Sequence, residues 1–241
     1  MSKTLKYILL SSVILFAGLA QAQQPQNNSL ANAKTTIQSK KDTTTIPVWQ
    51  GINIEIDIEP FIENAFTNNS TRNVYSYQGN VQANLKNSYL PVVEIGMGGA
   101  TRNLTNNTTF RGEGMFGKLG VDFNLLKPKP GTKINNNYFL AGARIGMSQF
   151  NYTTDNLTIE DNYWGGTETI NYSMPATKIW FEIVAGVRVE FFKNLYLGWN
   201  VRNKHLLNNG KYGAVTPWYI PGYGRGETSA WGFSYTVGYH F

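Results

Sequence analysis

The sequence predicts an all-β fold in which eight antiparallel strands close into an up-and-down barrel. Three observations predict this fold: apolar and polar residues alternate in eight separate runs, most runs are long, and short connections alternate with long ones. Successive side chains of a strand point to opposite faces, so each run has one apolar and one polar face. A chain of 241 residues is long enough for one such domain.

Residues 1–22 are predicted to be a cleaved signal peptide. Lys3 and Lys6 form a positively charged start, Tyr7 to Leu19 is a short apolar run, and Ala20-Gln21-Ala22 is a small-residue cleavage site. No later segment approaches the ~18 uninterrupted apolar residues of a membrane helix. We therefore expect an exported protein that has no membrane-spanning helix.

Residues 23–47 are rich in Gln, Asn, Ser, Thr and Lys and show no apolar period, so we expect a flexible N-terminal arm in the periplasm. The barrel is expected to occupy residues 48–241. The chain has no cysteine, which excludes disulfides and thiolate metal sites. The formal charge of +6 includes two lysines of the leader, and the remaining basic residues are scattered, so no nucleic-acid surface is indicated.

The first strand is predicted from the stretch INIEIDIEP. Ile52, Ile54, Ile56 and Ile58 occupy every second position, and acidic residues alternate with them. One face is therefore apolar and the other is mostly acidic. The same alternation predicts eight strands at about 48–62, 74–86, 90–102, 113–126, 137–151, 177–191, 194–206 and 229–241.

The connections between these runs differ in length. Short turns are expected near 87–88, 127–131 and 193–194. Longer loops are expected at about 63–73, 103–112, 152–176 and 207–228. Short turns at one end and long loops at the other are typical of outer-membrane barrels, whose short turns lie in the periplasm.

Two folds are compatible with a strand that has one apolar and one acidic face. A soluble sandwich would bury the isoleucines, whereas a membrane barrel would turn them to lipid. The 177–191 run carries seven apolar residues on one face, which is longer than a typical sandwich strand of ~5–6 residues. Aromatic residues also lie near strand ends, as in the interfacial girdles of membrane barrels. The sequence therefore favours a transmembrane barrel with a polar lumen.

The polar faces then meet inside a narrow lumen, where charges of opposite sign are expected to pair. Glu59 and Lys204 lie on the same faces. The expected luminal charge network consists of Glu55, Asp57, Glu94, Lys118, Asp122, Arg144, Glu182, Arg188, Glu190 and Arg202.

The chain ends in YTVGYHF, in which Tyr239 and the terminal Phe241 follow an alternating run. This ending resembles the signal that the barrel-assembly machinery of Gram-negative outer membranes recognises. Over about residues 48–241, the chain is similar to the small eight-stranded outer-membrane barrels of the OmpX and OmpA type. The stretches YLPVVEIGMG and WYIPGYG resemble an uncharacterised outer-membrane family with no assigned activity. The resemblance implies an outer-membrane location and contact with outer-membrane lipid.

No residue pattern indicates catalysis or a cofactor. His205 and His240 are the only histidines, and neither has an evident serine and acid at matching depth, so a metal site and a catalytic triad are not predicted. The loop TPWYIPGYGRGE at 216–227 is the one with concentrated aromatic character. Trp218, Tyr219 and Tyr223 are candidates for a surface that contacts an extracellular ligand, and a loop that caps the barrel is the favoured alternative.

Three functions are compatible with this sequence. The first is a non-enzymatic barrel with a structural or surface-interaction role and an unknown extracellular ligand. The second is a narrow porin-like channel for small solutes or ions. The third, a lipid-modifying enzyme within the barrel, requires a Ser, His and acid cluster that is not found.

Overall fold

The structure is a computed structural model that describes residues 47–60, 72–104, 107–126, 137–161, 166–208 and 215–241. The predicted signal peptide and nearly all of the predicted arm lie outside these ranges, as does the expected turn at 127–131. The strands are β1 (Trp49–Asp57), β2 (Arg72–Leu85), β3 (Tyr89–Asn103), β4 (Thr109–Asn124), β5 (Tyr138–Asp161), β6 (Gly166–Phe192), β7 (Leu195–Leu206), β8 (Tyr219–Ile220), β9 (Gly224–Arg225) and β10 (Ser229–His240).

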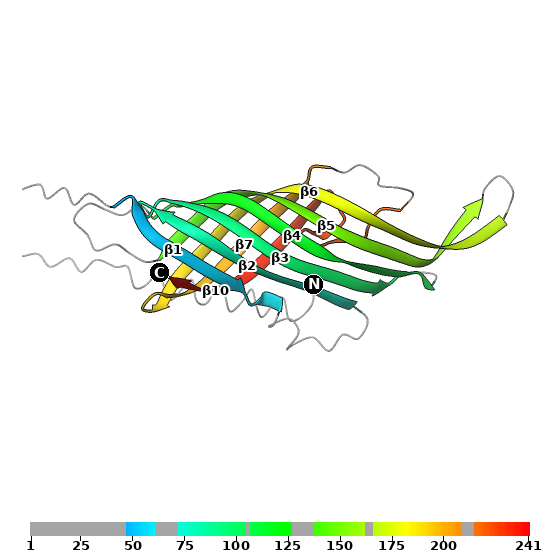
Figure 1. The fold of residues 1–241 in the computed structure, drawn as a ribbon, viewed down its shortest axis with the longest axis horizontal. Coiled ribbons are helices and arrows are strands. Elements are labelled where there is room, and N and C mark those ends of the chain that lie inside the picture. The colour runs from blue at the N-terminus through cyan, green and yellow to red at the C-terminus, as the bar shows by residue number, and fades with distance from the viewer. Residues whose placement is uncertain (1–46, 61–71, 105–106, 127–136, 162–165, 209–214) are drawn as a thin grey trace, which may run out of the picture. The chain divides into compact units, whose positions relative to one another are not determined.

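Eight of these strands form a closed antiparallel barrel in the order β1-β10-β7-β6-β5-β4-β3-β2 (Figure 1). Each strand pairs with its neighbours in the chain, and β10 closes the ring against β1 through pairs such as Ile54 with Tyr239. The predicted eight-stranded up-and-down barrel is therefore confirmed. β8 and β9 form a separate two-stranded sheet within the connection between β7 and β10.

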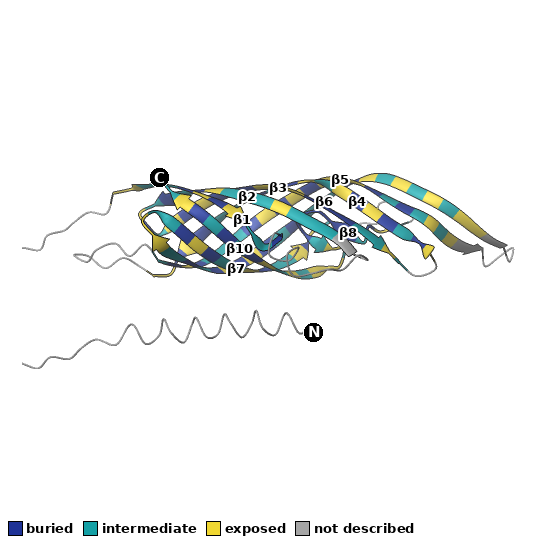
Figure 2. Ribbon diagram, turned by 90° about the horizontal axis from the view of Figure 1, so that it is seen from below, coloured by how far each residue is buried: buried dark blue, intermediate teal, exposed yellow. Residues whose placement is uncertain are grey.

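Buried and exposed residues alternate along the strands, as Figure 2 shows. In β1, Ile54 and Ile56 are 44% and 59% exposed, whereas Glu55 and Asp57 are 3% and 5% exposed. The isoleucines face outward and the acids face the lumen, which confirms the assignment of faces. Within the described ranges, no helix is both long and apolar enough to cross a bilayer.

The predicted strand ends are wrong at the end of the barrel opposite the start of β1 and the end of β10. β4 begins at Thr109, and most of the expected loop at 152–176 is strand, because β5 continues to Asp161 and β6 begins at Gly166. The outer faces of these segments are polar, with residues such as Arg111 and Ser173, whereas Phe110 and Tyr152 lie on their inner faces, so they lack the apolar outer face on which the prediction depended. Their backbones nevertheless pair from Leu157 with Ile170 to Asp161 with Gly166. In contrast, β1 ends at Asp57, earlier than predicted.

The short turns at the other end have the backbone geometry that tight hairpins require. Lys86 and Asn87 both have φ of 53°, and the Ser88 amide donates to the Leu85 carbonyl at 3.0 Å. Positive φ at both central residues matches the right-handed twist of the flanking strands. Asn194, in the turn between β6 and β7, has φ of 66°. These turns fix the register at the end where both β1 begins and β10 ends.

Candidate functional site: the filled lumen

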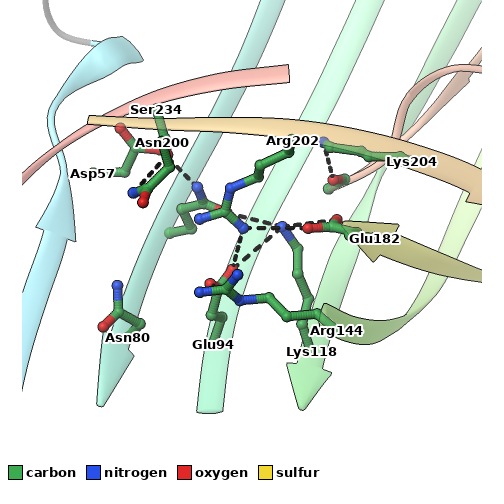
Figure 3. A network of polar contacts seen from close by, with 12 residues as sticks. Asp57, Asn80, Glu94, Lys118, Arg144, Glu182, Asn200, Arg202, Lys204 and Ser234 are labelled. Carbon is green, nitrogen blue, oxygen red and sulfur yellow. Dashed lines mark hydrogen bonds and ion pairs between the residues drawn. The ribbon is translucent and has the colours of Figure 1, made fainter. Parts of the chain in front are cut away.

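A layer of ion pairs crosses the middle of the lumen (Figure 3), and Glu94 on β3 is its centre. The Glu94 carboxylate lies 2.7 Å from Arg144 Nε, 2.7 Å from Arg202 Nη1 and 3.4 Å from Lys118 Nζ. These cations come from β5, β7 and β4, so one carboxylate joins strands from opposite walls. Glu94 is 1% exposed. Its burial is tolerated because three cations surround it.

Glu182 on β6 is the second carboxylate of this layer. It lies 3.3 Å from both Lys118 Nζ and Arg202 Nη1, so these two cations bridge Glu94 and Glu182. The indole Nε1 of Trp180 also donates to Glu182 at 2.7 Å. Glu182 is fully buried. These three partners fix the position of the Glu182 carboxylate within the layer.

Two further ion pairs extend the layer toward the short-turn end. Arg144 Nη2 donates to Asp122 at 2.9 Å, and Arg188 pairs with Glu55. Gln82 connects them, because its Nε2 donates to Asp122 at 2.8 Å and its Oε1 accepts from Arg188 at 2.7 Å. The structure thus joins eight of the ten predicted network residues by ion pairs. Gln82 was absent from the prediction because only charged residues were considered.

Asp57 and Glu190 are the other two predicted members, and hydrogen bonds hold both carboxylates. Asp57 accepts from Gln78 Nε2 at 2.6 Å and from the amides of Glu59 and Tyr235. Glu190 is half-buried near the short-turn end, where it accepts from the Asn194 amide at 2.8 Å. Both are on the luminal side, as expected, but each carboxylate stabilises backbone at a strand end.

Aromatic residues fill the lumen at the long-loop end, and sequence reasoning did not find them. Phe110, Phe116, Phe150, Tyr152 and Trp180 form one buried cluster. They occupy inward positions of strands whose inner face was expected to be polar throughout. The sequence did contain a signal for their position. Phe116, Phe150 and Trp180 each lie an even number of residues from a luminal charge of the same strand, so they are expected to point inward.

The 216–227 loop folds into this cluster at the long-loop end of the lumen. Ile220-Pro221-Gly222-Tyr223 is a tight turn in which the Tyr223 amide donates to the Ile220 carbonyl at 3.1 Å and Gly222 has φ of 76°. A glycine after proline is what a type II turn requires. The Tyr223 ring packs edge-on against Trp180 with centroids 5.8 Å apart. We refer to residues 217–226 as the plug.

The position of the plug determines whether Trp218, Tyr219 and Tyr223 can contact an extracellular ligand. Tyr219 and Tyr223 are 5% and 1% exposed, so their side chains are not available to a molecule outside the barrel. Trp218 is half-buried beneath the guanidinium of Arg102, which lies 4.5 Å from the ring centroid. Lys204 holds the plug from below by donating to the carbonyls of Gly222 and Tyr223 at 2.8 and 3.1 Å.

A second buried apolar cluster lies on the other side of the ion-pair layer. Leu90, Tyr138, Leu140 and Tyr196 pack together near the short-turn end. The Tyr138 hydroxyl accepts from Asn84 Nδ2 at 3.2 Å. The lumen therefore has three levels: an aromatic cluster with the plug, an ion-pair layer, and a smaller apolar cluster.

The remaining predicted residues lie at or near the ends of the barrel. Tyr239 and Phe241 are exposed on the outer surface, with ring centroids 4.7 Å apart. His240 faces Asn53, with 2.6 Å between Nδ1 and Oδ1, and His205 is exposed on β7. Within the described residues, no group of three or more His, Cys, Asp or Glu side chains is arranged to hold a metal ion.

A closed up-and-down barrel with side chains packed along its axis places the chain in the class of small filled β-barrels, since eight strands leave an interior only just wide enough for side chains. Within that class the chain belongs to the family described as domain of unknown function (DUF6048), whose model matches residues 4–241. No curated protein matches the chain. Among solved structures, it is similar to CarO2 of Acinetobacter baumannii, with 13% sequence identity and a TM-score of 0.39, over 79% of this chain and 97% of that chain.

Proposed function

We propose that the protein is an outer-membrane β-barrel with a structural or surface-interaction role and no enzymatic activity. The observation that carries this proposal is an apolar outer surface around a filled interior. An exposed apolar belt of this extent would favour aggregation in water, whereas in an outer membrane it would contact the acyl chains of the lipid. The exposed belt includes Ile54, Ile56, Val93, Ile95, Met97, Met115, Leu119, Ile145, Met147, Ile183, Val201 and Phe233.

The orientation follows from the two ends of the barrel. Exposed aromatic residues gather at the short-turn end, where amphipathic rings suit the depth of lipid headgroups. They include Trp49, Tyr89, Phe192 and Phe241. We place this end in the periplasm, as is usual for short turns. The exposed Tyr239 and Phe241 are then the segment that the barrel-assembly machinery recognises.

The β5–β6 hairpin is the element best suited to contact a partner outside the cell. β4 pairs with β5 only as far as Asp155, and β7 pairs with β6 only as far as Trp180. Beyond these residues the two strands continue as a ribbon that extends past the other strands in Figure 1. Its described side chains Glu168, Thr169 and Asn171 are exposed and polar. This ribbon supports a surface-interaction role.

A narrow channel for small solutes or ions is the competing function. An axial path would have to pass the plug, the ion-pair layer and the cluster around Leu90. Conductance in a planar bilayer distinguishes the two functions. We expect no steady conductance from the intact protein. Single-channel steps from the purified intact protein would favour the channel.

Two experiments test the location and orientation. A folded membrane barrel resists SDS, so unboiled protein from the outer-membrane fraction is expected to migrate differently from boiled protein. Because the chain lacks cysteine, single cysteines report accessibility directly. A membrane-impermeant maleimide is expected to label Thr169→Cys on intact cells but to label Lys193→Cys, in the β6–β7 turn, only after the outer membrane is opened.

Other results of these experiments would contradict the proposed location or the proposed orientation. Recovery of the protein in the soluble periplasmic fraction, with no heat-dependent shift, would overturn the membrane location. Equal labelling of both cysteines on intact cells, or labelling of Lys193→Cys alone, would overturn the orientation. Both variants change exposed residues, so neither is expected to disturb folding.

A further inference from the structure

The face of the β5–β6 ribbon that continues the luminal wall carries a row of apolar side chains. Tyr172 and Met174 of β6 pack against the buried aromatic cluster, and the rings of Tyr172 and Tyr152 have centroids 6.1 Å apart. Ile170 lies two residues further along β6, in the same phase, and is partly exposed. Leu157 is paired with Ile170 across the ribbon and is also partly exposed. We refer to Leu157, Ile170, Tyr172 and Met174 as the apolar stripe.

A β-bulge in β5 places Leu157 on this face. Thr154 is paired with Tyr172 of β6. The next pair joins Leu157 to Ile170, so two residues of β5 stand opposite one residue of β6, and Asn156 in the bulge has φ of 58°. Without the extra residue, alternation would turn Leu157 to the outer face. Bulges re-aim side chains in this way, so the stripe is a specified feature of the ribbon.

The β5–β6 hairpin is also acidic. In the sequence, residues 151–177 contain Asp155, Glu160, Asp161 and Glu168 and no lysine or arginine, whereas the whole chain has a formal charge of +6. Glu168 lies two residues beyond Ile170 in β6, so it is in phase with the apolar stripe, and it is exposed. One face of the ribbon therefore presents partly exposed apolar side chains followed by an exposed carboxylate.

The charge of this face selects the class of partner. Nucleic acids and anionic lipids are disfavoured, because like charges across an interface oppose association. A polypeptide segment that carries apolar side chains and a lysine or arginine on one side would complement both parts of the face. In an extended segment, these residues would occupy alternate positions.

We propose that the apolar stripe and Glu168 form a docking surface for a cationic segment of another polypeptide. Apolar side chains of that segment lie against Leu157 and Ile170, and its ammonium or guanidinium group lies beside Glu168. This inference rests on the proposed surface-interaction role of the ribbon and names the chemistry of the partner.

Two matched pairs of substitutions distinguish the two faces of the ribbon. Glu168→Gln and Ser173→Lys each make the formal charge more positive by one, but Ser173 is exposed on the outer face. Ile170→Asn and Thr169→Asn introduce the same polar side chain on opposite faces of β6. All four residues are exposed or partly exposed, so the variants are expected to fold. The heat-dependent mobility shift in SDS checks that each variant has folded.

The experiment is microscale thermophoresis of the purified barrel in phosphatidylcholine nanodiscs with the dye-labelled peptide Val-Thr-Val-Thr-Lys-Thr-Lys. Empty nanodiscs measure binding to lipid alone. We expect the parent protein to bind the peptide, and binding to weaken as salt is raised. Ile170→Asn is expected to bind about tenfold more weakly and Glu168→Gln about threefold more weakly, as for one apolar contact and one exposed ion pair. Thr169→Asn and Ser173→Lys are expected to bind like the parent protein.

Four outcomes would overturn the proposal. Equal weakening by Ile170→Asn and Thr169→Asn would exclude the apolar stripe, and equal weakening by Glu168→Gln and Ser173→Lys would leave only the overall charge. Equal binding of a peptide with glutamate in place of lysine would exclude recognition of a cation. Self-association of the parent protein in analytical ultracentrifugation, lost in Ile170→Asn, would make a second copy the occupant. These measurements use purified, folded protein, so their failure leaves the location tests of the proposed function unaffected.

Discussion

Replacement of Glu94 by glutamine tests whether the ion-pair layer stabilises the barrel. The substitution keeps the size of the side chain but leaves Lys118, Arg144 and Arg202 with a neutral amide at distances of 2.7 to 3.4 Å. Removing one partner of a buried ion pair costs about 3–5 kcal/mol, because the remaining charge stays desolvated. Each of the three cations keeps one other carboxylate, Asp122 or Glu182. We therefore expect a loss near the lower limit, about 3 kcal/mol.

The assay is urea unfolding of the barrel from lipid vesicles, followed by tryptophan fluorescence. Glu113→Gln is the control, since Glu113 is exposed on β4 and its substitution is expected to cost less than about 1 kcal/mol. Lys118→Met in the Glu94→Gln background is expected to recover part of the loss by removing one of the three cations that lost Glu94, while Glu182 keeps Arg202 and Trp180 as partners. A loss below about 1 kcal/mol for Glu94→Gln would refute the stabilising role, because it would mean that water reaches the layer.

Three other substitutions test separate parts of the structure. Ile54→Lys on the outer face is expected to cost about 2–4 kcal/mol if the face contacts lipid; an unchanged unfolding midpoint in vesicles would contradict that contact. Gly222→Ala is expected to cost about 2–4 kcal/mol, from its positive φ and a Cβ only 2.4 Å from a phenyl ring. Gly224→Ala, with φ of 115° and open space around its Cβ, serves as its control, and equal losses would show that packing of the plug contributes nothing. Lys86→Asn is expected to stabilise the barrel by about 0.5–1 kcal/mol, because asparagine tolerates φ of 53° better; a lower midpoint would contradict the turn assignment.

The fold and the charged layer were predictable because both depend on a period of two. Ile54 and Glu55 can exchange faces only if the whole strand slips by one residue, so the alternation fixes which side chains meet in the lumen. Closure of the ring then brings the charged residues of different strands into the same lumen. Eight of the ten predicted charges indeed form ion pairs.

The aromatic cluster, the plug and the β5–β6 ribbon were not predictable in the same way. Phe116 and Trp180 are apolar residues on a polar face, and alternation alone does not show that they meet a loop from the other end of the chain. The ribbon is held by backbone hydrogen bonds between polar segments, which leave no pattern of burial in the sequence. All three features depend on contacts between segments rather than on the period within one segment.

The ion-pair layer also explains how a barrel with an apolar exterior keeps one register. If the lumen were filled only by apolar residues, a strand such as β4 would be apolar on both faces, and a slip by one residue would have little cost. With Glu94 opposite Lys118 and Lys118 opposite Gly146, a one-residue slip would move a buried charge onto the outer surface. A two-residue slip would place Glu94 opposite Phe116 or Gly120 instead of its cation. Buried ion pairs are often no more stabilising than apolar packing, so we infer that these charges are retained because they specify the register.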